Sequence, residues 1–97
     1  MERDAYILTI RPGMEARYFE VHRVVWPELI EAASRSGVRN HGSWVHERTV
    51  FIYLEAENLK RTYERLLAEP VKQKWDEFMS SILEPGSVPL EEAFHMD

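Results

Sequence analysis

The chain has 97 residues, of which 44% are hydrophobic, 11% aromatic and 30% charged, the composition of an ordinary globular protein with one core. Its formal net charge of -5 argues against nucleic acid and anionic membrane surfaces as partners, because both require a basic face. It contains no cysteine, which excludes disulfides, thiolate nucleophiles and thiolate metal sites.

These numbers predict a single domain over residues 1–97. No apolar run approaches the roughly 20 residues that span a bilayer, and the first residues lack the basic and apolar regions of a signal peptide. We therefore expect a cytoplasmic protein with no membrane partner.

The N-terminal third predicts a strand and a long helix. Residues 4–11 alternate between two faces and are rich in β-branched and aromatic side chains, which is typical of a strand. Residues 14–36 carry side chains at three- and four-residue steps on one helical face: Met14, Tyr18, Val21, His22, Val25, Leu29, Ala32 and Ala33. Pro27 has no N–H to donate and its ring collides with the carbonyl of Arg23, so we expect one helix bent near His22. Gly37 accepts the left-handed position that ends a helix.

The middle of the chain predicts a β-hairpin. Residues 38–46 and 49–56 read as two antiparallel strands joined by the pair Glu47-Arg48. No Gly or Asn supports a tight turn there, so the pattern leaves the register open. His41 and Arg39 share one face of the first of these strands by alternation.

Two helices and a last strand follow. Asn58 is an N-cap residue type, and residues 59–68 have an apolar stripe at helical spacing. Pro70 interrupts this pattern, and residues 71–83 resume it. After a loop at residues 84–89, residues 90–96 predict a final strand.

This order predicts an α+β fold of the ferredoxin-like, split βαβ type, with a four-stranded antiparallel sheet and helices on one face. Apolar residues occur on both sides of two strands, as in Ile7 against Leu8 and Phe51 against Ile52. We therefore expect a homodimer in which the free sheet faces pack together.

The candidate site centres on Tyr18 and His22, one turn apart on the inward stripe. A buried phenol and imidazole must each find a hydrogen-bond partner, because an unpaired buried polar group costs roughly 1 to 3 kcal/mol. That partner is either protein or ligand. From spacing alone, a satisfied core histidine is the commoner case.

The string Tyr18, His22 and Trp26-Pro27-Glu28-Leu29 resembles the L-rhamnose mutarotase family. Weaker matches follow in the same order, namely Gly37 with Asn40, the 71–75 segment with Gln73-Lys74-Trp75, and Phe94. The resemblance implies a dimeric α+β barrel and an enzyme that interconverts the α and β anomers of a pyranose without a metal or organic cofactor. It also implies that His22 is the proton donor and that Tyr18 binds the sugar.

Two positions depart from the family pattern. His41 stands where the family has a sugar-binding tyrosine in its second strand, and Trp75-Asp76 stands where it has a Trp-Trp pair. An imidazole and a carboxylate suit a more hydroxylated or differently substituted ligand than rhamnose. We expect His41, Trp75 and Asp76 to bind substrate, Trp75 by offering its flat face to sugar C–H groups.

Mutarotation needs one proton delivered to the ring oxygen while another leaves the anomeric hydroxyl. Histidine changes charge near neutral pH, and a positioned proton transfer contributes about 100-fold to 10,000-fold in rate. The second acid–base group is Asp76 or His41, and Arg39 is a candidate for holding a sugar hydroxyl or a carboxylate.

Other interpretations stay open. Trp75 is a core residue if the resemblance is set aside, and His46 and His95 are surface residues. His22, His41 and Asp76 are a possible metal-ligand set, although no local motif supports one. A cofactor-free isomerase or cyclase acting on a lactone or polyketide-like substrate and a non-catalytic ligand-binding dimer are the alternative functions.

Overall fold

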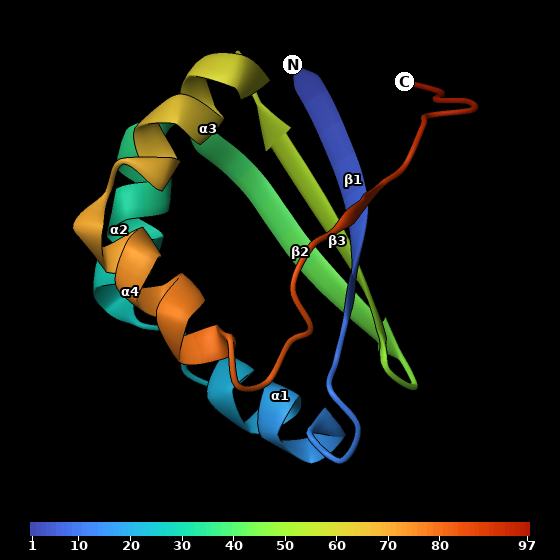
Figure 1. The fold of residues 1–97 in the computed structure, drawn as a ribbon. Coiled ribbons are helices and arrows are strands. Elements are labelled where there is room, and N and C mark those ends of the chain that lie inside the picture. The colour runs from blue at the N-terminus through green and yellow to red at the C-terminus, as the bar shows by residue number, and fades with distance from the viewer.

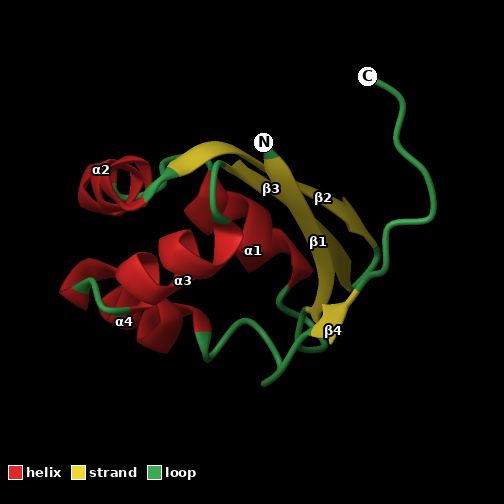
Figure 2. Cartoon of the chain, turned by 90° about the horizontal axis from the view of Figure 1, so that it is seen from above, coloured by secondary structure: helices red, strands yellow, loops and turns green.

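A computed structural model describes residues 1–97 as four helices and a four-stranded sheet. The elements are β1 (Glu2–Thr9), α1 (Glu15–His22), α2 (Pro27–Ser36), β2 (Val38–His46), β3 (Thr49–Ala56), α3 (Leu59–Leu67), α4 (Pro70–Met79) and β4 (Val88–Pro89). The strands are antiparallel in the order β2-β3-β1-β4. All four helices lie on one side of the sheet, as Figures 1 and 2 show. The predicted ferredoxin-like α+β fold is confirmed, and none of the helices is long and apolar enough to cross a membrane.

The single bent helix predicted over residues 14–36 is wrong, because α1 and α2 are separate helices. Residues 23–26 between them are not helical. Trp26, which precedes the proline, has an extended backbone with φ -53° and ψ 124°, as the proline ring requires of its neighbour. Pro27 occupies the first turn of α2, where a helix needs no N–H donor. The predicted end at Gly37 is confirmed, with φ 118°.

The central hairpin has the predicted bounds. His46 pairs with Thr49, so Glu47 and Arg48 form a two-residue turn. Glu47 adopts a positive φ of 56°, a left-handed conformation that glycine or asparagine adopts more readily. Arg48 fastens this turn to the end of β1, because its Nε donates to the carbonyl of Ile10 at 2.9 Å.

The C-terminal strand predicted at residues 90–96 is wrong. Only Val88 and Pro89 form β4, where they pair with Ile7 and Tyr6 of β1. β4 is an edge strand, and a proline is tolerated at an edge because its missing N–H is not needed for a ladder. Residues 90–97 have no regular structure. The Leu90 N–H donates to the Ala5 carbonyl and Arg3 donates to Glu92, so the start of this segment stays beside β1, and the C-terminus then leaves the sheet (Figure 1).

The two faces of the sheet differ in what covers them. The helix-covered face carries the core, in which Ile10, Val50, Ile52, Trp75, Met79 and Ile82 are buried. The other face carries an apolar row across all four strands, because Trp44 pairs with Phe51, Phe51 with Ile7, and Ile7 with Val88. Trp44 is 61% exposed, Phe51 42% and Val88 58%. We call these four residues the outer row.

Candidate functional site

His22 is the last residue of α1, and a main-chain carbonyl one turn earlier holds its imidazole. Nδ1 lies 2.7 Å from the carbonyl oxygen of Tyr18. A carbonyl oxygen can only accept, so Nδ1 carries the hydrogen of this bond. Nε2 makes no hydrogen bond within the protein and is therefore the nitrogen free to exchange a proton with a ligand.

Aromatic side chains fix the plane of this imidazole. The ring stacks on Tyr18 with 4.1 Å between centroids, and it meets the ring of Trp75 edge-on at 5.5 Å. Trp75 is in turn packed edge-on against Trp26 at 5.0 Å. The break after α1 lets Trp26 turn toward α4, so the irregular segment that separates the helices also supports His22.

Tyr18 and His22 line a cavity of about 410 Å³ at the β2 edge of the sheet, with Phe19, Arg23, Ser43, Trp44 and Val45. His22 is half-buried, so it is not sealed in the core. Tyr18 is only 3% exposed, and this burial raises the pKa of its phenol, although the Ser43 hydroxyl opposes the effect. The two residues thus present a neutral phenol and an imidazole to one space.

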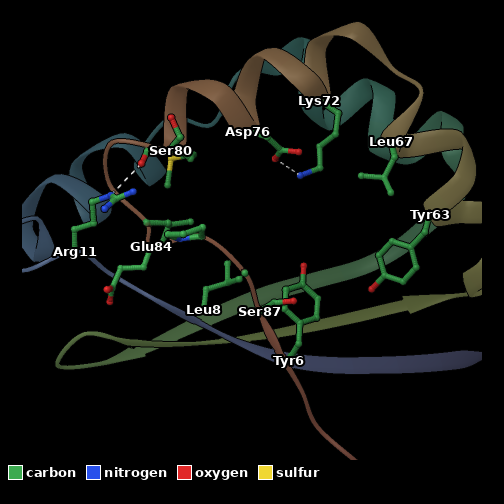
Figure 3. Close-up of a pocket in the computed structure, with 14 residues that line it drawn as sticks. Tyr6, Leu8, Arg11, Tyr63, Leu67, Lys72, Asp76, Ser80, Glu84 and Ser87 are labelled. Carbon is green, nitrogen blue, oxygen red and sulfur yellow. Dashed lines mark hydrogen bonds and ion pairs between the residues drawn. The ribbon is translucent and has the colours of Figure 1, made fainter.

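Asp76 lines a different cavity, of about 550 Å³, on the other side of the site. It lies between α4 and β1, and Figure 3 shows Lys72 and Asp76 above it, with Tyr6 rising from the sheet below. Lys72 and Asp76 form an ion pair one helical turn apart. At the far end, the Tyr63 hydroxyl donates to Asp4 at 2.6 Å, and burial and this carboxylate raise the pKa of Tyr63.

His41 is on the helix-covered face of β2, because it pairs with the buried Leu54, and it lines neither cavity. The residue is exposed to solvent, but enough protein surrounds the imidazole to remove part of its hydration. This burial lowers the pKa of His41, and the charges of Lys72 and His22 lower it further. The lowered pKa favours the neutral form of this imidazole.

The expected position of Arg39 is corrected, and the alternative of a metal site finds no support. Arg39 does not face the site, because a β-bulge between Val38 and Asn40 breaks the alternation that placed it beside His41. Its guanidinium donates instead to the carbonyls of Ser34 at 3.1 Å and Val38 at 3.3 Å. The metal-ligand set of His22, His41 and Asp76 is not assembled, since no three His, Asp or Glu side chains are grouped to hold an ion.

Sequence reasoning missed Tyr6, Tyr63 and Lys72 as residues of this region. Tyr6 could have been found from the alternation of β1, which puts it on the same face as Leu8. Lys72 had a weaker signal, its i to i+4 spacing from Asp76.

Comparison with known proteins agrees with this geometry. The sequence profile of the L-rhamnose mutarotase family matches residues 3–96. The L-rhamnose mutarotase of Bacteroides thetaiotaomicron is 33% identical over 104 aligned residues, which cover the whole of both chains. The crystal structure of an L-rhamnose mutarotase from Formosa agariphila superposes with a TM-score of 0.87 at 28% identity, and each chain is fully covered.

Proteins of lower sequence identity share the fold of this chain. Tetracenomycin F2 cyclase from Streptomyces glaucescens, a type-II polyketide cyclase, superposes with a TM-score of 0.66 at 17% identity. The match covers 100% of this chain and 98% of the cyclase. At that identity the two share an architecture, which carries no chemistry by itself.

Proposed function

Because this chain belongs to the L-rhamnose mutarotase family, and is thus an isomerase of the sugar mutarotase type, we propose that it interconverts the anomers of L-rhamnose or a related pyranose by proton transfer through His22. The observation that carries this mechanism is the hydrogen bond between Nδ1 and the Tyr18 carbonyl, because it leaves Nε2 free in a cavity wall. A neutral imidazole held this way accepts a proton at Nε2, and an imidazolium donates one from the same atom.

In the ring-opening step, the His22 imidazolium donates its Nε2 proton to the ring oxygen as the bond from that oxygen to C1 breaks. A base takes the proton of the anomeric hydroxyl, and C1 becomes an aldehyde carbon. The open chain rotates about C1–C2, and the hydroxyl that His22 protonated closes on the other face of the carbonyl. The two protons return along the same routes, so neither the acid nor the base is consumed.

We assign the base to His41. Its lowered pKa keeps the imidazole neutral and able to accept, and the charge of His22 is one cause of that shift, so the two rings share one electrostatic environment. Asp76 is less suited to this step because Lys72 pairs with its carboxylate and it lines the other cavity. We assign Asp76 to substrate binding.

Tyr18 and Trp75 both contact the imidazole of His22. Tyr18 binds the sugar through its phenol, since both it and His22 line the same cavity. Trp75 is 8% exposed and touches His22 edge-on, so most of its effect is to position the imidazole.

Saturation-transfer NMR on a panel of reducing sugars tests this function. Irradiation of one anomeric proton should reduce the signal of the other anomer only when the protein is present. Binding without exchange would instead support a non-catalytic ligand-binding protein. Neither binding nor exchange with any sugar would support a different isomerase or a cyclase, as in the alternative function above.

We also propose a homodimer formed through the uncovered sheet face. The outer row crosses every strand, and three of its four side chains, Trp44, Phe51 and Val88, are exposed in a single chain. A continuous apolar stripe of this kind favours a self-complementary contact between copies. The partner's sheet would then cover the face that the helices leave bare.

A further inference from the structure

We propose that the cavity between α4 and β1 binds an exocyclic hydroxyl of the sugar, so that the preferred substrate is a pyranose with a hydroxymethyl group and not a 6-deoxy sugar. This inference rests on the proposed mutarotase function. It names the part of the substrate that lies away from His22, and it assigns Tyr6 and Lys72 as specificity-determining residues beside Asp76.

The two cavities share no lining residue but lie close together on the helix-covered face of the sheet. Tyr6 pairs with Ile52 and Ile52 with Ser43, so these three residues form one row on the helix-covered face. Tyr6 lines the α4 cavity and Ser43 lines the His22 cavity. Neighbouring strands lie about 4.8 Å apart, so the two residues are separated by roughly 10 Å. A pyranose with its substituents can span this distance from the acid to the α4 cavity.

Three polar side chains in the α4 cavity can bind a hydroxyl: Tyr6, and the ion pair of Lys72 and Asp76, each of which keeps further hydrogen-bonding capacity. In Figure 3, Tyr6 points up from β1 toward Lys72 and Asp76 on α4. The Tyr6 hydroxyl makes no hydrogen bond within the protein, and burial, with the nearby Asp4 and Asp76 charges, raises the pKa of Tyr6 to about 12. It is therefore a protonated donor at any working pH. Lys72 is a second donor and Asp76 an acceptor.

Two donors and one acceptor in the same cavity are best matched by a hydroxyl group. A hydroxyl donates to Asp76 and accepts from Tyr6 or Lys72 at once, so it satisfies groups of both kinds. A methyl in the same place would displace water from these groups and give no hydrogen bond in return. A carboxylate would gain from Lys72 but meet the negative charge of Asp76 at the same time.

The test compares L-mannose with L-rhamnose, which differ only in the hydroxyl on C6. Enzyme-catalysed anomer exchange is measured by NMR for both sugars, and kcat/KM for L-mannose should exceed that for L-rhamnose by about 10-fold or more. Tyr6→Phe and Lys72→Met keep nearly the original side-chain volume and should each bring the ratio several-fold toward one. Lys74→Met is the matched control, because Lys74 is exposed on the same helix and lines neither cavity.

The outcomes separate the two claims. If the enzyme exchanges L-rhamnose as fast as L-mannose, or if neither variant changes the ratio, the hydroxyl subsite is refuted while the mutarotase function stands. If no sugar exchanges above its spontaneous rate, the proposed function fails and the subsite fails with it. A ratio that falls in both variants and not in Lys74→Met supports the subsite.

Discussion

Replacing His22 by alanine should remove most catalysis while leaving a folded protein. The variant loses the Nε2 proton carrier together with three contacts, the bond to the Tyr18 carbonyl, the stack on Tyr18 and the edge contact with Trp75. The chemical and structural losses differ enough in size to be measured apart.

The structural loss is small. Aromatic pairs contribute about 0.5 to 1.5 kcal/mol each when buried, and a neutral hydrogen bond about 1 kcal/mol. His22 is half-buried, so we expect a loss of about 2 kcal/mol in the free energy of unfolding, or roughly 10 °C in melting temperature for a domain of this size. The catalytic loss should be about 100-fold to 10,000-fold, which corresponds to about 3 to 5 kcal/mol in the barrier.

Anomer exchange by NMR and thermal unfolding should be measured on the same samples. His22→Gln is the sharper variant, because its amide occupies much of the imidazole's space but cannot carry a proton. Tyr18→Phe should mainly raise KM, by roughly fivefold for one lost hydrogen bond of about 1 kcal/mol. His46→Ala, an exposed histidine outside both cavities, is the control and should change neither quantity. Wild-type exchange per folded molecule in His22→Ala, with only a lower melting temperature, would show that His22 is a packing residue and would end the mechanism.

Three further outcomes are expected. The value of kcat/KM should rise with pH through the pKa of His41, which burial places below its ordinary value of 6.5, so activity should persist below that pH. In His41→Gln the residual kcat/KM should no longer fall at low pH. An unchanged dependence of kcat/KM on pH would show that His41 is not the base. Sedimentation should give twice the chain mass at micromolar concentration, and Phe51→Glu should halve it while Ile30→Glu, exposed on α2, should not. A wild-type monomer would contradict the dimer. Glu47→Gly should raise the free energy of unfolding in urea by about 0.5 to 1 kcal/mol, because it relieves the positive φ of 56°, and a lower value would mean that the chain-entropy cost of glycine dominates.

The sheet was predictable where one face of a strand is buried along its whole length. The bounds of β2 and β3 match the predicted residues, because the alternation of the buried Val50, Ile52 and Leu54 shows which side of β3 faces the core. The register, which the sequence left open, is seen only in the structure, where His46 pairs with Thr49. The N-cap of α3 was also predicted correctly, since the Asn58 side chain accepts a hydrogen bond from the Arg61 N–H at 3.0 Å.

The helix break was not predictable from spacing. Val25 and Trp26 pack against the core from a non-helical segment, so the apolar spacing continues across residues where the helix does not. β4 is only two residues long, which is too short for any periodicity to register.

The candidate site also has a part that the sequence predicts and a part that only the fold brings together. Tyr18 and His22 are visible in the sequence because one helical turn brings them together. Lys72 and Asp76 are one turn apart on α4, but Tyr6 faces them only because α4 crosses over β1, a tertiary arrangement that no local pattern encodes.

The strand order also sets the sequence of events in folding. β1 is made first, but the strand that pairs with its whole length is β3. Glu2 therefore cannot pair until Ala56 has been made, nor Thr9 until Thr49 has. The β2–β3 hairpin needs only neighbouring residues and can close within microseconds. On a ribosome the first strand therefore leaves the exit tunnel before either of its neighbours, β3 and β4, has been made, and the slow event is its pairing with β3. A nascent chain that ends before this hairpin already contains His22 but has no sheet on which to place it.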